Sequence, residues 1–394
     1  MKKKALIFIE DTSFTFDNRV KQMAAALVDN GWDITVVSQK FHDDPFCRKV
    51  SDRLRSYHFP KPTAEGALGH VFEHAYTLIA GTLITAWVAL RHGFSVFHAC
   101  NPMDIMWLLA LPYKLIGKRF IFDQHDLCPE LYLSRENTSE SDAFYRALLF
   151  LERGSYRSAN AVISTNESYR TMAATRGGRD REHVFVVRNG PNMDRLRSVP
   201  PRTDLKSEGE TLVGYLGNIN PQDGVDLTLE AAQYIRTELG RTDIKFVLVG
   251  GGSTQPVLAA QSKEMGLSDL VTFTGRLPDD EMLATLGACE FCLQPDPKNP
   301  LNDKSTMNKV MEYMAIGKPV IAFDLVETRV SCGDAALYAE PNEISDLAKK
   351  IVFLADHPEE RERMSRLGKE RVDNQLLWSY SVPHLVAAYE HATR

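Results

Sequence analysis

The sequence contains no apolar run long enough to cross a bilayer as a helix. The longest largely apolar stretch, residues 78–90, has 13 residues and is interrupted by Gly81 and by threonines, whereas a membrane-spanning helix needs about 20. At the N-terminus, only the apolar segment 5–9 separates the initial lysines from Glu10 and Asp11. Such a segment is too short for the core of a signal peptide, so we expect a cytoplasmic protein.

Cysteines are few and are scattered along the chain. Of the 6 cysteines, only Cys289 and Cys292 form a C-x-x-C pair, and no second pair follows at the spacing of a zinc site. Cys289 ends an apolar, helix-like stretch and Cys292 begins a strand-like one. We therefore expect two buried thiols with neither a metal-binding nor a redox function.

Charge of one sign does not dominate the chain either. The net charge is -6, which does not favour nucleic acid as a partner. The distribution is uneven, because residues 1–125 contain 15 Lys/Arg against 12 Asp/Glu, which leaves the rest of the chain acidic. With 44% hydrophobic and 25% charged residues, the composition is typical of a globular protein. A length of 394 residues favours two domains.

Apolar strand-like runs alternate with helical patterns in two successive series. Uninterrupted apolar strands between helices of ten or more residues are typical of parallel sheets covered on both faces. We therefore predict an α/β protein with two facing, doubly wound, Rossmann-like domains over residues 1–195 and 196–375, and a final helix over 376–394. The expected strands are 5–9, 33–38, 95–99, 119–123, 161–165, 184–188, 211–216, 245–249, 271–274, 291–294, 320–323 and 337–339.

Polar and glycine-rich segments follow several of these strands. Ligands of doubly wound sheets bind at the carboxyl ends of the strands, and glycine lets backbone N–H groups approach a phosphate. A packed loop residue remains the alternative for each histidine. The segments are His98–Pro102, Asp123–Asp126, Asn189–Pro191, Gly217–Gly224, Gly250–Ser253 and Gly275–Arg276.

The most informative segment is 305–322, which predicts a helix closed by Gly317 and followed directly by a buried strand. Met307, Met311 and Met314 recur at helical spacing and form an apolar stripe. Glu312 lies in the middle of this helix, and a carboxylate there needs a partner, because burying one unpaired costs several kcal/mol. A ribose with two neighbouring hydroxyls would satisfy it. A solvated glutamate on the outer face of the helix is the alternative.

Together these segments resemble the retaining glycosyltransferases of the two-Rossmann-domain (GT-B) type, in family 4. The resemblance covers nearly the whole chain, and its most specific part is the segment from Met311 to Val320. The remaining correspondences are Asp17–Val20, Phe97–Asn101, Phe122–Asp126 with Pro129–Glu130, Asn189–Pro191, Gly214–Gly217 and Phe273–Arg276.

The resemblance implies transfer of a sugar from a nucleotide-sugar donor to a hydroxyl acceptor, without a metal ion or other cofactor. A UDP-sugar is the first expectation and a GDP-sugar the second, and the acceptor would be a glycan or a lipid-linked molecule in polysaccharide or glycoconjugate synthesis. The final helix would cross back to the N-terminal domain. Two alternatives stay open, namely a non-catalytic GT-B binding or partner subunit and a nucleotide-sugar epimerase.

The resemblance also assigns roles to individual residues. Glu312 would grip the ribose hydroxyls and His125 would reach the transferred sugar. The candidate catalytic residues are His125, Asp126 and Lys304. The acceptor-side candidates are Phe14, Phe16, Arg19, Asn101 and Asn189. The donor-binding candidates are Gly217, Asn218, Gly250, Gly251, Arg276, Leu277, Ser305, Thr306, Met307, Asn308, Lys309 and Glu312.

The chain departs from the family pattern at three charged positions. Lys304 replaces the first Glu of the E-x7-E motif, so Asp303 or the backbone amides of 305–308 would take over that role. Asn218 and Asp223 replace an Arg and a Lys that usually face the diphosphate. We expect cations elsewhere to compensate, with Lys309, Lys304 and Arg276 as candidates, and Asp223 to turn toward the motif helix or a lysine.

A peripheral membrane contact is a further hypothesis. The stretch 66–90 is apolar and contains histidines and a tryptophan, and it lies in the more basic part of the chain. Family members that act on lipid-linked acceptors dock through this domain, which would place the protein at the inner face of the plasma membrane. Two ordinary core-facing helices are the alternative.

Overall fold

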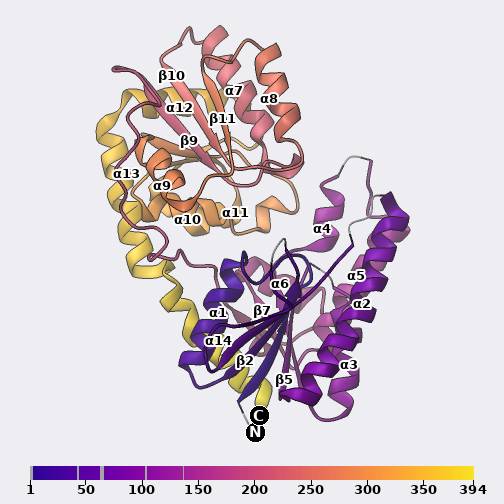
Figure 1. Ribbon diagram of the computed structural model, residues 1–394. Helices are drawn as coiled ribbons and strands as arrows, with labels where there is room; N and C mark the ends of the chain where they lie inside the picture. Colours follow the sequence, from indigo (N-terminus) through magenta and orange to yellow (C-terminus); the bar gives the residue numbers. More distant parts are fainter. Residues whose placement is uncertain (1–2, 42–43, 63–65, 103, 136) are drawn as a thin grey trace. The chain divides into compact units, whose positions relative to one another are not determined.

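A computed structural model of the chain describes all residues except 1–2, 42–43, 63–65, 103 and 136 (Figure 1). Met1 and Lys2, on which the expectation about targeting partly rests, lie outside the described residues. The chain forms two compact units. Unit 1 comprises residues 1–189 and 379–394, and unit 2 comprises residues 190–378. These divisions fall close to the expected domain limits at 195 and 375.

Unit 1 is built on a sheet with the strand order β3-β4-β2-β1-β5-β6-β7-β8, in which all pairs are parallel except β3 with β4. Strand order reverses between β1 and β5, which is where ligands of such sheets bind. The strands are β1 Lys4–Phe8, β2 Asp33–Gln39, β3 Cys47–Lys49, β4 Leu54–Phe59, β5 Val96–Cys100, β6 Arg119–Gln124, β7 Ala161–Ser164 and β8 Val184–Val186. The helices are α1 Asn18–Asp29, α2 Gly66–Arg91, α3 Met106–Leu115, α4 Cys128–Leu133, α5 Ala143–Ser158, α6 Glu167–Thr175 and α14 Trp378–Thr393.

Unit 2 contains a fully parallel sheet with the order β11-β10-β9-β12-β13-β14, which reverses between β9 and β12. Cys289 and Cys292 are buried free thiols, as predicted. The strands are β9 Thr211–Leu216, β10 Ile244–Val249, β11 Val271–Gly275, β12 Phe291–Gln294, β13 Val320–Phe323 and β14 Ala336–Ala339. The helices are α7 Val225–Thr237, α8 Gln255–Glu264, α9 Asp279–Ala288, α10 Asn308–Ala315, α11 Val326–Cys332, α12 Ile344–Asp356 and α13 Pro358–Arg371.

The predicted α/β class with two doubly wound domains is confirmed. The sequence pattern missed β4, because its Ser56 and His58 are polar yet buried. The two side chains satisfy each other through Ser56 Oγ and His58 Nε2, 2.9 Å apart. The stretch 66–91 forms one 26-residue helix, α2, rather than two. Among the described residues, no helix is both long and apolar enough to cross a membrane.

Helix α14 returns to unit 1, as predicted, and is held there by Tyr389. Its ring is fully buried and packs edge-on against Trp32 at 4.9 Å between centroids. Its hydroxyl lies 2.7 Å from His98 Nδ1, on β5. The last helix in the sequence thereby supports a buried histidine on β5, next to the point where the strand order reverses.

We expect Tyr389→Ala to destabilise unit 1 by about 3–5 kcal/mol, because it leaves a cavity and removes the partner of a buried histidine. Urea unfolding followed by tryptophan fluorescence would report this unit, since Trp32, Trp87 and Trp107 belong to it. Tyr380→Ala, on the same helix but 46% exposed, is the matched control and should change stability by less than about 1 kcal/mol. Equal effects of the two substitutions would contradict the assigned role.

Candidate active-site residues in the two units

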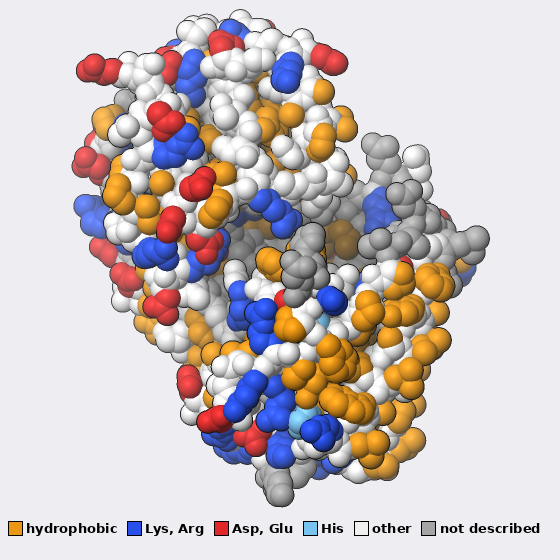
Figure 2. All heavy atoms as spheres, viewed as in Figure 1, with side chains coloured by type: hydrophobic (Ala, Val, Ile, Leu, Met, Phe, Trp, Pro, Cys, Tyr) orange, Lys and Arg blue, Asp and Glu red, His pale blue; other side chains and the backbone are white. Residues whose placement is uncertain are grey.

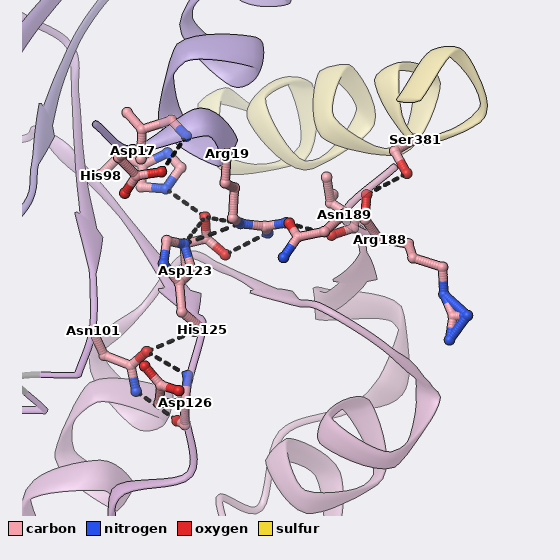
Figure 3. Close-up of polar contacts among 12 residues, drawn as sticks. Asp17, Arg19, His98, Asn101, Asp123, His125, Asp126, Arg188, Asn189 and Ser381 are labelled. Atoms are coloured by element: carbon pink, nitrogen blue, oxygen red, sulfur yellow. Dashed lines mark hydrogen bonds and ion pairs between the residues drawn. The ribbon is translucent and has the colours of Figure 1, made fainter. Parts of the chain in front are cut away.

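A buried ion pair organises the carboxyl end of β6 in unit 1. Arg19, in the first turn of α1, donates through Nη2 to Asp123 Oδ1 at 2.8 Å. Its Nη1 donates to the Val187 carbonyl at 2.8 Å and to Asn189 Oδ1 (Figure 3). Burial by itself would raise the pKa of Asp123, but Arg19 and His125 outweigh it and hold that pKa well below its usual range. Asp123 therefore stays ionised.

Two histidines share the second oxygen of this carboxylate. Asp123 Oδ2 lies 2.9 Å from His125 Nε2 and 3.4 Å from His98 Nε2. Arg19 Nε also lies 3.0 Å from His125 Nε2, but one nitrogen cannot both donate and accept. Burial lowers the pKa of His125, yet the Asp123 carboxylate prevails and raises it above its ordinary value. Nε2 therefore carries the proton and donates it to Asp123, which fixes the ring.

Asn101 holds the turn that carries His125 and Asp126. Its Oδ1 accepts from the backbone N–H groups of His125 at 2.6 Å and Asp126 at 3.0 Å, and its Nδ2 donates to the Asp126 carbonyl at 2.7 Å. Figure 3 shows this arrangement beside the ion pair. Burial raises the pKa of Asp126 despite the opposing charge of His125.

The acceptor-side candidates differ in exposure. Arg19 and Asn101 are buried and bond to protein atoms, so they position other residues, and their contact with an acceptor stays a prediction. Phe14 is also buried and anchors its loop, whereas Phe16 is exposed and packs edge-on against Phe41 at 4.8 Å. Asn189 is half-buried and accepts from Arg19. Contact between Asn189 or Phe16 and an acceptor stays a prediction.

His98, Cys100 and Asp123 lie close enough together to hold a metal ion. Their chemistry does not favour this, because the Arg19 guanidinium already neutralises the carboxylate and would repel a cation. His98 also uses both ring nitrogens, one toward Tyr389 and the other toward Asp123. Metal independence stays a prediction.

In unit 2, three glycine-containing turns at the ends of neighbouring strands are joined by backbone hydrogen bonds. Gly217 N–H donates to the Val249 carbonyl at 3.0 Å, and Gly250 N–H donates to the Gly275 carbonyl at 2.9 Å. A Cβ atom at Gly250 would lie 1.8 Å from the Gly217 carbonyl oxygen, so only glycine fits. These two N–H groups hold the turns together, which corrects the expectation that they face a phosphate.

Tyr313 fixes helix α10 against the end of β9, and Glu312 joins the helix to Arg195. The buried Tyr313 hydroxyl accepts from the Leu216 N–H at 2.7 Å, at the end of β9. Glu312 is 22% exposed but not unpaired, because its Oε1 accepts from Arg195 Nη1 at 2.7 Å. Arg195 Nε reaches Asp279 at 2.9 Å. Burial raises the pKa of Glu312, against the pull of Arg195.

One turn before Glu312, Lys309 occupies a second charged cluster. Its ammonium lies 2.9 Å from Asp296 Oδ2 and stands over the Tyr215 ring at 4.8 Å. Its side chain passes beside Gly217, since Lys309 Cε would lie 3.4 Å from a Cβ there. Asp223 closes the turn by accepting from the Asn220 N–H at 3.0 Å, and burial raises its pKa to about 6 although Lys309 lowers it.

The segment before α10 differs from expectation. Asp303 Oδ1 accepts from the Val326 N–H at 3.0 Å, at the start of α11, and its replacement of the missing glutamate stays a prediction. Lys304 Nζ donates to the Pro300 carbonyl at 2.9 Å. The Ser305 N–H donates to the Asn302 carbonyl at 3.2 Å, so it is already used. The amides of Thr306, Met307 and Asn308 stay candidates.

The other predicted donor residues lie on the surface of the same edge. Arg276 and Asn218 are exposed, and Leu277 is partly buried against the core. A Cβ atom at Gly251 would lie 3.4 Å from Arg276 Cγ, so the arginine stem covers that turn. Direct contacts of these residues with a donor stay predictions.

Sequence reasoning missed Arg195, Asp296 and Tyr215 as members of the charged clusters. Arg195 lies far from Glu312 in the sequence, and no pattern links the two. Asp296 follows β12 directly, so the rule that was applied to the other strand ends could have found it.

Comparisons with known proteins agree with this geometry. Residues 17–190 match the family profile described as glycosyl transferase 4-like domain, and residues 210–357 match glycosyl transferases group 1. The 2-deoxystreptamine glucosyltransferase of Streptomyces kanamyceticus is 24% identical over 94% of this chain and 97% of its own.

Solved structures share the fold. Sucrose-phosphate synthase from Thermosynechococcus elongatus superposes with a TM-score of 0.78 at 18% identity, over 98% of both chains. HepE from Anabaena, determined in complex with UDP-glucose, gives a TM-score of 0.70 at 16% identity, over 98% of this chain and 99% of its own.

We expect Arg19→Ala to cost about 3–5 kcal/mol of folding stability at pH 7, because it leaves the buried Asp123 charge without its partner. Without the guanidinium the Asp123 pKa rises above its unfolded value, so protonation relieves the cost and the deficit should shrink as the pH falls toward 4. Denaturant unfolding across this pH range measures both effects. Arg53→Ala, in an ion pair whose partners are 44% and 45% exposed, should cost less than about 1 kcal/mol. A deficit that does not change with pH would contradict the assignment.

Proposed function

We propose, from the fact that this chain belongs to the family 4 glycosyltransferases of the GT-B fold, that it transfers a sugar from a nucleotide-sugar donor to a hydroxyl group with retention of anomeric configuration. Unit 2 binds the donor. Residues of unit 1 act on the sugar and the acceptor. No metal ion or other cofactor takes part.

The observation that carries this proposal is the pair of opposite charges on α10. Lys309 and Glu312 are three residues apart, which places them on the same side of a helix. A nucleoside diphosphate needs a hydrogen-bond acceptor for its ribose hydroxyls and a cation for its phosphates. The Glu312 carboxylate supplies the hydrogen-bond acceptor. Arg195 bonds its Oε1, so Oε2 would accept from the ribose hydroxyls. The Lys309 ammonium, beside the Gly217 turn, supplies the cation.

Lys309 supplies positive charge in place of the Arg and the Lys that the family usually has at the positions of Asn218 and Asp223. The positive charge comes from the first turn of α10 instead of the loop after β9. Amides at the start of α10 and the helix dipole add to it. Together they stabilise the leaving diphosphate without a metal ion. Asp296, paired with Lys309, keeps the ammonium in place.

His125 is assigned to the transferred sugar. Because its Nε2–H is committed to Asp123, Nδ1 is the ring atom available to a sugar hydroxyl. The raised pKa favours the imidazolium, which would donate from Nδ1 and also offset negative charge on the leaving group. Asp126 is the neighbouring carboxylate for the acceptor hydroxyl.

A UDP-sugar is the first choice of donor, because the structurally similar HepE was determined with UDP and with UDP-glucose. A GDP-sugar is the second. The acceptor is a glycan or a lipid-linked molecule in polysaccharide or glycoconjugate synthesis.

A donor panel tests the proposal. A thermal-shift screen with UDP-, GDP- and ADP-sugars should stabilise the protein with one base above the others. That donor should then release nucleoside diphosphate in the presence of EDTA, and NMR of the product should show the retained anomer. Stabilisation without any diphosphate release, across a panel of acceptors, would favour a binding subunit. A strict requirement for a divalent cation would overturn the proposed stabilisation by Lys309.

We expect Glu312→Ala to weaken donor binding by about 2–3 kcal/mol, because it removes a charge-assisted contact to the ribose. Isothermal titration calorimetry with the donor found in the screen measures this change. Asp279→Asn is the matched control, because it alters the other partner of Arg195 without touching the carboxylate on α10. Donor affinity that stays at the wild-type level in Glu312→Ala would refute the ribose contact.

We also expect donor affinity to fall as the pH rises through about 6, where Asp223 becomes ionised and repels the diphosphate. UDP-glucose is a suitable probe, since its bridged phosphates do not titrate in this range. Asp223→Asn should bind the donor more tightly than wild type above pH 6 and should lose most of the pH dependence. The same pH profile in wild type and Asp223→Asn would show that another group is responsible.

A further inference from the structure

Helix α2 is apolar on the face that it turns outward. No charged residue occurs between Glu73 and Arg91. The inner face packs Ile84 and Val88 into the core of unit 1, and Thr85 Oγ1 lies 2.8 Å from the Tyr113 hydroxyl of α3. A helix that is apolar all round is normally buried. Here the outer stripe is exposed, with Leu90 at 89% and the others being Ile79, Leu83 and Trp87.

The apolar surface continues onto the two neighbouring helices. Helix α3 packs against both α2 and α5, and Trp107 of α3 covers Gly154 of α5 so closely that a Cβ there would lie 2.5 Å from its Nε1. Figure 2 shows hydrophobic side chains gathered over the region where α2 and α3 lie in Figure 1. Exposed apolar side chains on α3, in the turn after it and on α5 include Leu108, Leu111, Leu115, Ile116 and Phe150. We call these and the α2 stripe the apolar face.

The charges that accompany the apolar face are almost all positive. Helices α2, α3 and α5 contain two acidic residues, Glu73 and Glu152, and Glu152 is fully buried in an ion pair with Arg176 at 2.6 Å. Arg91 ends α2, and exposed arginines flank Phe150 on its own side of α5 at helical spacing. They are Arg146, Arg153 and Arg157.

We propose that the apolar face docks on an anionic lipid bilayer. Exposed leucines and a tryptophan would enter the boundary between headgroups and acyl chains, and the arginines would meet lipid phosphates. A second copy of the chain fits less well. A two-fold contact through this face would enclose arginines from both copies. Among the described residues of α2, α3 and α5, only Glu73 is an acid that is not buried, so few carboxylates could pair with them.

This inference deepens the proposed function, because it selects a membrane-bound acceptor from the two acceptor classes. It does not depend on the donor site, since the apolar face lies within unit 1 and the donor residues within unit 2. Loss of docking should therefore leave diphosphate release with a water-soluble acceptor unchanged, and loss of activity through α10 should leave docking unchanged.

Vesicle flotation of the full chain tests the inference. Wild type should float with vesicles of phosphatidylcholine and phosphatidylglycerol at low salt, and less with phosphatidylcholine alone or at high salt. Leu83→Glu/Leu90→Glu should abolish flotation. Arg153→Glu/Arg157→Glu should weaken it about twenty-five-fold or more, since each cation contributes about fivefold. Val257→Glu and Lys349→Glu, at exposed positions of unit 2, are the matched controls and should float like wild type.

Three results would overturn the proposal. The first is that wild type does not float with anionic vesicles at low salt. The second is that both double variants float as well as the controls. The third is that light scattering without lipid shows a dimer that Leu83→Glu/Leu90→Glu dissociates, which would identify the apolar face as a contact between copies. All substituted positions are exposed or half-exposed, and thermal midpoints near that of wild type confirm that each variant is folded.

Discussion

Pairing of buried charges is the constraint on which both units depend. Asp123 is fully buried and stays ionised because Arg19 reaches it from α1. Glu130 and Glu152 share Arg176 in the same unit, and Asp296 holds Lys309 in the other. An unpaired charge at any of these places would cost several kcal/mol. The Arg19–Asp123 and Lys309–Asp296 pairs each fix a helix near the end of a strand, and candidate site residues lie on those elements. Arg176, at the end of α6, instead joins that helix to α4 and α5.

The same ion pairs also determine the protonation and the position of candidate site residues. In unit 1, the carboxylate that anchors Arg19 also sets the proton position of His125, so one buried group determines both local stability and the hydrogen-bonding state of the proposed sugar contact. In unit 2, α10 brings an ammonium and a carboxylate to one side of a single turn of helix. In the proposed function, the charge that compensates for Asn218 and Asp223 would come from a rigid helix instead of a loop, and a rigid helix loses less conformational entropy on binding.

Most of the fold could be predicted from the sequence, because continuous apolar strands and helical periodicity are local patterns. Strands such as 291–294 and 320–323 have the predicted limits. The sequence pattern did not predict elements whose buried residues depend on partners that are distant in the sequence. Strand β4 contains Ser56 and His58, which bond each other, and His58 also bonds Ser38 of β2. Helix α13 is highly charged and gave no apolar signal, although Met364 on it is buried.

The sequence by itself determined the α/β class, the two-domain division and the family, and it selected Glu312, His125 and Lys309 as candidate site residues, since short motifs and strand-end positions express these directly. Only the tertiary structure decided what those residues contact. Arg195 pairs with Glu312 across 117 residues of sequence, and Arg19 with Asp123 across 104. It also showed that Arg19 and Asn101 are buried and hold neighbouring backbone and side chains in place. The physical reason is that burial and pairing are properties of the packed sheet, which no local pattern encodes.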